Sequence, residues 1–289
     1  MRQPPARGLS RRGRRLADAS PTPEYFRIHG ERSATPYQAG SRPDGYIPFC
    51  VAEHGLVCAL LFTTPNNPLG TVYQPAELEE IVRFAERAGI HVVFDEVYAL
   101  SVFGRTPFTS IAALRPSLGD HIHIVWAFSK DFAASGLRCG TLITENRDVM
   151  YEVEALAYWA CVSGDTQFLL VEMVSDDAWV GAYIGAMQSR LRGAYRAITS
   201  RLDHAGIPYL PSEAGFFLII DLRRYLTAPT WEAEDALWRR ILDEANVNLT
   251  PGSACRIAEP GFMRLCFAAV SQETGAVGVA RLAGVLSRA

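Results

Sequence analysis

Lys130 is the only lysine among the 28 lysine and arginine residues of this 289-residue chain. Arginine keeps its proton at any pH at which proteins remain folded. A lysine amine, in contrast, can be desolvated, lose its proton and attack a carbonyl carbon. The amine stands in the segment Trp126–Asp131 (WAFSKD). We therefore take Lys130 as a candidate nucleophile; the alternative is that a compositional bias against lysine left one residue by chance.

A nucleophilic lysine that forms an imine with an aromatic aldehyde cofactor needs several partners. A carboxylate must keep the ring nitrogen protonated so that the ring can accept electrons, and Asp95, which ends HVVFD, suits this role. Neutral donors for the ring hydroxyl are available in Asn67 and Tyr98. A phosphate needs a cation such as Arg138, and a substrate carboxylate needs a two-pronged donor such as Arg264. The plainer interpretations are a strand-end acid for Asp95 and surface charges for the two arginines.

The elements that must position these residues alternate between strands and helices. Helical spacing of apolar residues predicts a helix at 75–88, between Pro75 and Gly89, and a helix or turn near 110–114. Short apolar runs predict strands at 58–63, 90–94, 122–128 and 138–144. This alternation indicates an α/β fold with a mostly parallel sheet and flanking helices.

In a parallel sheet, ligands bind at the carboxyl ends of the strands. Asn67 follows the first predicted strand, and Asp95 and Tyr98 follow the second. Lys130 follows the third. The sequence therefore predicts that these four residues meet at one edge of the sheet.

The second half of the chain is helical at first and then mixed. Residues 147–188 predict helix with a turn around 162–165, and helix continues through 191–205. The predicted elements after Gly206 are strands at 216–222, 247–250 and 263–267 and helices at 231–245 and 272–287. We expect an N-terminal arm and small-domain segment at 1–57, a large domain at 58–193 and a small α+β domain at 194–289.

Four motifs occur in order along the chain. They are Thr64–Gly70 (TPNNPLG), Phe94–Tyr98 (FDEVY), Ser129–Gly140 (SKD…SGLRCG) and Pro251–Ala268 (PGSAC…EPGFMRLCFA). Together they resemble the fold-type I pyridoxal-phosphate enzymes of the class I/II aminotransferase group. Within that group the chain is most similar to the 1-aminocyclopropane-1-carboxylate (ACC) synthase-like branch, which the segment Thr35–Glu53 also resembles.

The resemblance implies a role for each matching residue. Lys130 would hold pyridoxal phosphate as an imine and then shuttle the substrate's α-proton, while Asp95 would pair with the ring nitrogen. Asn67 and Tyr98 would bind the ring hydroxyl. The residues implied for the phosphate are Arg138 and Ser129, and those for the substrate are Arg264 at the α-carboxylate and Glu53 near the substrate end.

One large departure from the resembled family lies between Glu53 and the strand at 58–63. A segment on the order of a hundred residues, the size of a small domain, normally separates these two parts. It carries the phosphate-binding helix N-terminus, the aromatic that stacks on the cofactor and a tyrosine that reaches the neighbouring subunit. Ala127 and Thr64 also replace a common serine and asparagine. We therefore expect an incomplete large domain, a weakened phosphate site and exposed sheet edges.

Three functions follow from these observations. The first is a pyridoxal-phosphate-dependent transformation of an amino acid, of the aminotransferase type. The second is a lyase, either ACC synthase-like or one that breaks a C–S bond by β-elimination. The third is a non-catalytic remnant that acts as a pseudoenzyme. The resemblance also implies a homodimer and a small amino-acid substrate.

Composition narrows the class of protein further. A net charge of −3 gives no global basic field for nucleic acid, and no apolar run reaches membrane-spanning length. The six cysteines are scattered, which is typical of a reducing compartment. We expect a cytoplasmic protein; the arginine-rich first 16 residues could alternatively be a mitochondrial transit peptide. His121 and His123 are expected to be structural, and no metal site is predicted.

Overall fold

A computed structural model describes residues 49–53 and 56–288 of the chain. For residues 49–53, 56 and 57 it describes the backbone alone. The segment Thr35–Pro48 and most of the predicted arm therefore lie outside the described residues. No helix in the described part is long and apolar enough to cross a membrane.

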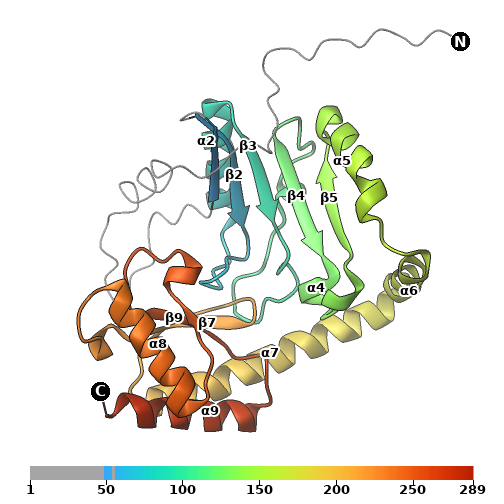
Figure 1. The fold of residues 1–289 in the computed structure, drawn as a ribbon. Helices are drawn as coiled ribbons and strands as arrows, with labels where there is room; N and C mark the ends of the chain where they lie inside the picture. The colour runs from blue at the N-terminus through green and yellow to red at the C-terminus, as the bar shows by residue number, and fades with distance from the viewer. Residues whose placement is uncertain (1–48, 54–55, 289) are drawn as a thin grey trace, which may run out of the picture.

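The described chain forms two sheets joined by a long helix (Figure 1). The first sheet has the order β1-β2-β3-β4-β5. Its strands are β1 (Phe49–Glu53), β2 (Leu56–Thr63), β3 (His91–Asp95), β4 (Ile122–Ala127) and β5 (Gly140–Thr144). The second sheet has the order β6-β7-β9-β8. Its strands are β6 (Tyr209–Leu210), β7 (Phe217–Asp221), β8 (Thr250–Pro251) and β9 (Phe262–Cys266).

The helices flank the two sheets. They are α2 (Pro75–Ala88), α3 (Ile111–Leu114), α4 (Phe128–Asp131), α5 (Arg147–Ala160), α6 (Gly164–Val174), α7 (Asp177–Ala205), α8 (Trp231–Ala245) and α9 (Gln272–Leu286). In the described part of the chain, the short 3-10 helices are η2 (Ser135–Leu137), η3 (Arg223–Tyr225) and η4 (Ser253–Cys255). α7 runs from the neighbourhood of α4 to the second sheet, where α9 packs along it (Figure 1).

The predicted parallel core of the first sheet is present. β2, β3 and β4 are parallel, while β1 and β5 add antiparallel to the two sides. Thr63 pairs with Asp95, and Asp95 pairs with Val125. The three parallel strands therefore end in register, which places the segments that follow them at one edge of the sheet.

Each sheet has its own core. In the first, Leu78 and Val82 of α2 are buried against Phe62 and Phe94 of the strands. In the second, Ile198 and Leu202 of α7 pack with β7, β9, α8 and α9. The predicted domain boundary at residue 194 falls inside α7, and Leu191, before that boundary, already belongs to the core of the second sheet.

The structure corrects several predicted boundaries. The strand predicted at 138–144 begins only at Gly140, because Arg138 adopts a left-handed conformation (φ 51°) at the end of η2. The long helical region breaks at 161–163, which overlaps the turn predicted at 162–165, although Gly164 and Asp165 already belong to α6. It breaks again before α7, where Asp176 accepts a hydrogen bond from the Trp179 amide (2.9 Å). The strand predicted at 247–250 shrinks to Thr250–Pro251, since the Leu249 carbonyl accepts a bond from the Trp238 indole (2.8 Å) instead.

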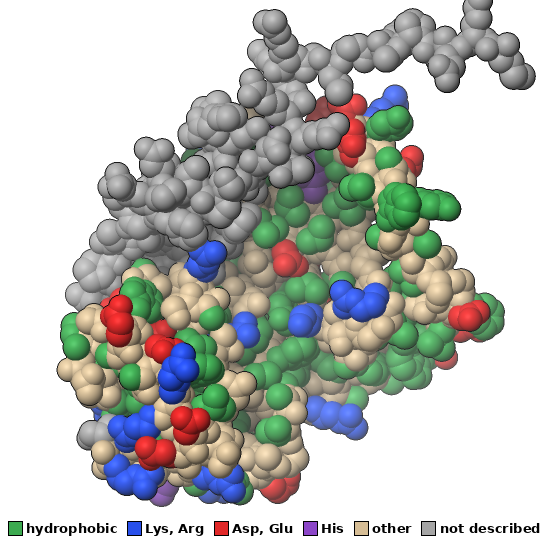
Figure 2. All heavy atoms as spheres, in the orientation of Figure 1, with side chains coloured by type: hydrophobic (Ala, Val, Ile, Leu, Met, Phe, Trp, Pro, Cys, Tyr) green, Lys and Arg blue, Asp and Glu red, His purple; other side chains and the backbone are tan. Residues whose placement is uncertain are grey.

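The expected exposed edges are present on one side of the first sheet. The edge of β2 is covered by β1, which we had not predicted as a strand. β5 is the last strand on the other side and pairs, within the described chain, with β4 alone. Next to it, α5 has no buried residue, and Tyr158 and Trp159 are 80% and 84% exposed. Figure 2 shows this apolar surface on the α5–α6 side of the molecule.

Candidate active site

The aligned strand ends bring Lys130 close to Asp95. Lys130 lies half-buried in α4, which starts directly after β4. The pKa of Asp95 is raised above 3.8 by burial, and a hydrogen bond from the Val97 amide (3.1 Å) and the charge of Lys130 oppose this shift. The amine and the carboxylate thus interact electrostatically at the edge where the sequence placed them.

Tyr98 lies in the same neighbourhood and is buried. Its ring makes edge-to-face contacts with Phe216 and Phe217, with 5.5 Å between centroids in each case. Burial raises its pKa to about 12, although the positive charge of Arg264 opposes the shift. The phenol therefore keeps its proton near neutral pH and remains a hydrogen-bond donor.

Arg264 joins the site from the other sheet. It lies in β9, and its Nη1 donates to the amide oxygen of Asn67 at 2.9 Å. Its Nη2 donates to the Thr250 hydroxyl at 3.3 Å, and the guanidinium lies 5.2 Å from the ring centroid of Phe217. Among the ion pairs between described residues, none involves Arg264.

A close seam between the two halves of the chain makes the Asn67–Arg264 contact possible. The carbonyl of Gly70 accepts hydrogen bonds from the amides of Glu213 (3.0 Å) and Ala214 (3.1 Å). Gly70 has φ +65°, and a Cβ there would lie 1.8 Å from the hydroxyl oxygen of Ser212. Only glycine fits at this point, which explains the glycine that ends the motif TPNNPLG.

The phosphate end of the predicted site is less complete. Arg138 is exposed, and its Nη1 donates to the carbonyl of Ser135 (2.9 Å) in its own turn. No interaction between Arg138 and the other predicted site residues is found in the described chain. Ser129 lies half-buried in α4, one residue before Lys130. The backbone of Glu53 ends β1, and its side chain lies outside the described residues.

Sequence reasoning missed Asp131. This residue is 1% exposed, and its two carboxylate oxygens accept hydrogen bonds from Ser101, Leu100 and Trp126. The sequence feature that could have identified Asp131 is its place directly after the only lysine, but we noted this acid only as part of a motif.

The histidines form a separate cluster at the opposite ends of the strands. Nδ1 of His91 lies 2.9 Å from Nε2 of His123, whose Nδ1 lies 2.7 Å from the Thr144 hydroxyl. His121 lies beside His91, with 4.7 Å between ring centroids and an angle of 40° between the ring planes. Among the described residues, no group of three or more His, Cys, Asp or Glu side chains is arranged to hold a metal ion.

Comparison with known proteins defines the class. The sequence profile described as "Aminotransferase class I and II" matches residues 51–282. The chain therefore belongs to the class I and II aminotransferase family, whose members depend on pyridoxal phosphate.

Two curated relatives carry ACC synthase names. A Homo sapiens "1-aminocyclopropane-1-carboxylate synthase-like protein 1" is 42% identical over 214 residues, covering 73% of this chain and 42% of the relative. An Arabidopsis thaliana "1-aminocyclopropane-1-carboxylate synthase 11" is 37% identical over 237 residues, covering 80% and 52%. The chain thus spans about half the length of these relatives, as expected for a chain that lacks an internal segment.

Solved structures give the same fold. An aromatic aminotransferase from Pyrococcus horikoshii superposes with a TM-score of 0.72 at 25% identity, covering 80% of this chain and 60% of that one. An aspartate aminotransferase from Thermotoga maritima has a TM-score of 0.67 at 27% identity, covering 80% and 56%. The aspartate aminotransferase-like fold predicted from the sequence is confirmed.

The residues at the strand ends fit pyridoxal phosphate at its ring. An amine, a half-buried carboxylate whose pKa responds to the charge of that amine, and a protonated phenol are groups that suit this ring. Lys130, Asp95, Tyr98 and Asn67 would hold the ring. For the phosphate the described chain offers Ser129 and Arg138, of which Arg138 is turned toward its own backbone.

Proposed function

We propose that this chain binds pyridoxal phosphate at Lys130 and transforms an amino acid by transamination. The observation that carries the proposal is the Thr63–Asp95–Val125 register, which aligns the strand ends so that α4 with Lys130 begins beside Asp95, whose pKa responds to the charge of Lys130. When bound, the cofactor supplies an aldehyde that condenses with amines and a ring that accepts electrons.

The protein's own residues would then have separate tasks. Asp95 holds a proton at the ring nitrogen, and Tyr98 donates its phenol hydrogen to the ring hydroxyl. Arg264 binds the α-carboxylate of the substrate through two parallel N–H groups, which also fixes the orientation of the Cα–H bond. Lys130, once its amine is free, takes the proton from Cα as a general base.

Burial assists these tasks. Tyr98 is 5% exposed, and Asp95 is half-buried at the end of β3. In a site with little water, the carboxylate and the guanidinium interact more strongly with charges on the ligand than they would in solvent.

A lyase of the ACC synthase type is the second candidate, and the names of the two curated relatives favour it. Elimination shares its first step, removal of the α-proton, with transamination. The same four residues would therefore serve both reactions.

A non-catalytic remnant is the third candidate. The observation in its favour is the orientation of Arg138, which bonds to its own turn rather than to the site.

We also propose that the protein is a homodimer; the exposed apolar surface of α5 and α6 supports this.

The test is product analysis with purified protein, pyridoxal phosphate and a panel of amino acids with a 2-oxo acid as amino acceptor. Transamination predicts a new amino acid formed from the 2-oxo acid. A lyase predicts products of C–S cleavage or ring closure without an acceptor. Lys130→Ala must abolish either outcome. If wild-type protein and Lys130→Ala are equally inactive with every amino acid, the remnant is correct and the enzyme proposal is overturned.

A further inference from the structure

Asp131 is a buried acid that none of the proposed steps uses. Its Oδ1 accepts a hydrogen bond from the Ser101 hydroxyl at 2.6 Å. Its Oδ2 accepts from the Leu100 amide at 3.0 Å and from the Trp126 indole at 2.9 Å. Three donors on two other segments thus converge on one carboxylate, directly beside Lys130 in the chain.

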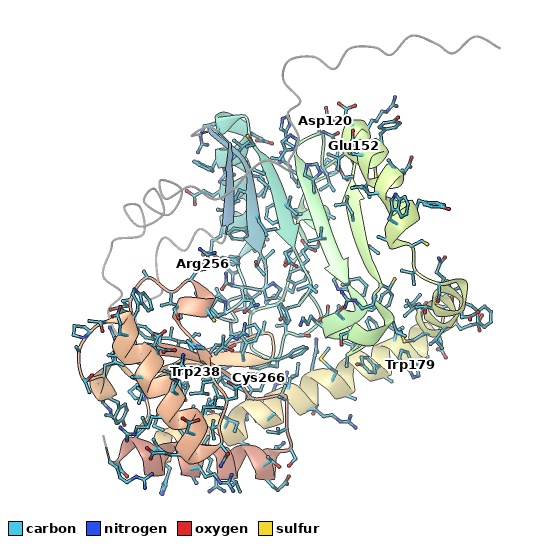
Figure 3. All side chains as sticks on the ribbon, viewed as in Figure 1. Asp120, Glu152, Trp179, Trp238, Arg256 and Cys266 are labelled. Atoms are coloured by element: carbon cyan, nitrogen blue, oxygen red, sulfur yellow. The ribbon has the colours of Figure 1, made fainter. Side chains whose placement is uncertain are left out.

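The helix that carries Lys130 cannot hold its own position. α4 has four residues, and a single turn of helix is not stable without tertiary contacts. Asp131 supplies the contacts described above. In addition, the Phe132 ring stacks on Tyr183 of α7, with 5.3 Å between centroids, and on Trp179 at 6.5 Å. Trp179 is labelled on α7 in Figure 3. The place of the amine is therefore set by the two residues that follow it, Asp131 and Phe132.

The segment that donates hydrogen bonds to Asp131 through Leu100 and Ser101 is itself part of the site. It follows Tyr98 directly, and the amide of Ser101 donates to the Tyr98 carbonyl at 3.0 Å. The side chain of Gln188 in α7 donates to the Leu100 carbonyl at 2.9 Å. This segment is thus fixed to α7, and Asp131 links it to α4.

We propose that Asp131 is a positioning residue for Lys130. Its carboxylate ties the turn that carries the amine to the segment that carries Tyr98, so that both groups face the same ligand. The inference rests on the proposed role of Lys130 as the reactive amine. Asp131 acts through the geometry of its three hydrogen bonds, and its charge is secondary.

The hydrogen bonds of Asp131 predict different results for two substitutions at this position. Asp131→Ala leaves the Leu100 amide and the Trp126 indole without an acceptor, so α4 is released. In Asp131→Asn the amide oxygen can accept both of these bonds, while its NH2 group donates to the Ser101 hydroxyl, which is able to accept. The asparagine variant therefore retains all three contacts without the charge.

Lys130 can be followed selectively because the chain has no other lysine. One measurement is the affinity for pyridoxal phosphate, from borohydride-trapped adduct at Lys130 together with the induced circular dichroism of the adduct. A second is the rate of reductive methylation of Lys130 by formaldehyde and cyanoborohydride, followed by mass spectrometry, which needs no cofactor. Thermal unfolding establishes that each variant is folded at the assay temperature.

We expect Asp131→Ala to weaken the adduct on the order of tenfold and to speed methylation several-fold, because misplacement by about 1 Å has effects of this size or larger. Asp131→Asn should stay within about threefold of wild type in both measurements. The matched control is Asp243→Ala, which removes an exposed acid from α8 and should change neither measurement.

Two milder variants keep the test decisive if Asp131→Ala does not fold. Ser101→Ala and Trp126→Phe each remove one donor and should give intermediate changes, again in opposite directions for the two measurements. Unchanged behaviour of all of these variants would overturn the inference, as would an Asp131→Asn protein as impaired as Asp131→Ala. Wild-type protein that forms no adduct at Lys130 would instead overturn the proposed function, while the methylation rates would still decide the role of Asp131.

Discussion

Lys130 and Arg138 lie eight residues apart in the chain, yet their surroundings differ sharply. Lys130 is half-buried and acts electrostatically on Asp95, and its helix is held by hydrogen bonds and stacked rings. Arg138 is exposed, in a left-handed conformation, and bonded to the carbonyl of its own turn. The amine end of the site is therefore organised by the rest of the fold, and the phosphate end is not.

The difference follows from which parts of the fold each end depends on. The amine end needs β2, β3, β4 and α7, and all four are present. The phosphate end in the resembled family draws on the segment that this chain lacks. A chain can thus keep the chemistry-bearing edge of a sheet while losing one of the structures that complete the ligand site.

The strongest effect should come from Asp95→Asn. Replacing the carboxylate removes a charge-assisted hydrogen bond to the ring nitrogen, which contributes about 1.5–3 kcal/mol. The apparent affinity for pyridoxal phosphate should fall about 10- to 100-fold, measured by absorbance titration. An unchanged affinity would show that the amine end does not hold the ring in the proposed way.

A smaller effect is expected from Arg264→Lys. Lysine keeps the charge and loses the two-pronged geometry, which is not conservative at a carboxylate site. Binding of alanine, methionine and tyrosine to the pyridoxal-phosphate-loaded protein should weaken by a similar factor, on the order of tenfold, because all three share the α-carboxylate. A loss confined to one of these amino acids would contradict the assignment and indicate a side-chain contact.

The pH dependence of stability tests the burial of Asp95, which belongs to the amine end of the site. Burial raises the pKa of Asp95 in the folded state, so the folded protein holds a proton that the unfolded chain releases. The stability contributed by this proton is complete below 3.8, the ordinary value, and is lost as pH rises through the raised pKa. Wild type should therefore lose unfolding free energy relative to Asp95→Asn over that window, as measured by denaturant unfolding at a series of pH values. A difference that is flat or increases with pH would contradict the burial of Asp95.

Arg138→Ala should have the smallest effect. Because the guanidinium is exposed and bonded to Ser135, its removal should change the affinity for pyridoxal phosphate less than about threefold, within the small effects typical of surface substitutions. Unphosphorylated pyridoxal provides the control, since it cannot sense the phosphate end. A large loss with pyridoxal phosphate and none with pyridoxal would show that Arg138 turns to hold the phosphate, and the two ends would no longer differ.

Much of the amine end could be predicted from the sequence. Strand ends are local features, and the parallel alternation alone places Asn67, Asp95 and Lys130 at one edge of a sheet. The helices at 75–88 and 231–245 were predicted with the boundaries that the structure has, because proline, glycine and apolar spacing mark them locally.

The parts that could not be predicted depend on distant contacts or on backbone conformation. Arg264 reaches Asn67 across 197 residues, through a seam that requires Gly70 to lie against Ser212. The three bonds to Asp131 come from segments that only the fold brings together. The direction of Arg138 is set by a positive φ at a non-glycine residue, for which the sequence carries no signal.

The amine of Lys130 should be reactive beside Asp95, and peptide mapping after reduction is the most informative test of this reactivity. Purified protein is incubated with pyridoxal phosphate, reduced with borohydride and digested, and the labelled peptide is identified by mass spectrometry. We expect one label per chain, on Lys130, and a strong decrease in the amount of label in Asp95→Asn. A wild-type protein that carries no label at Lys130 at millimolar pyridoxal phosphate would contradict it.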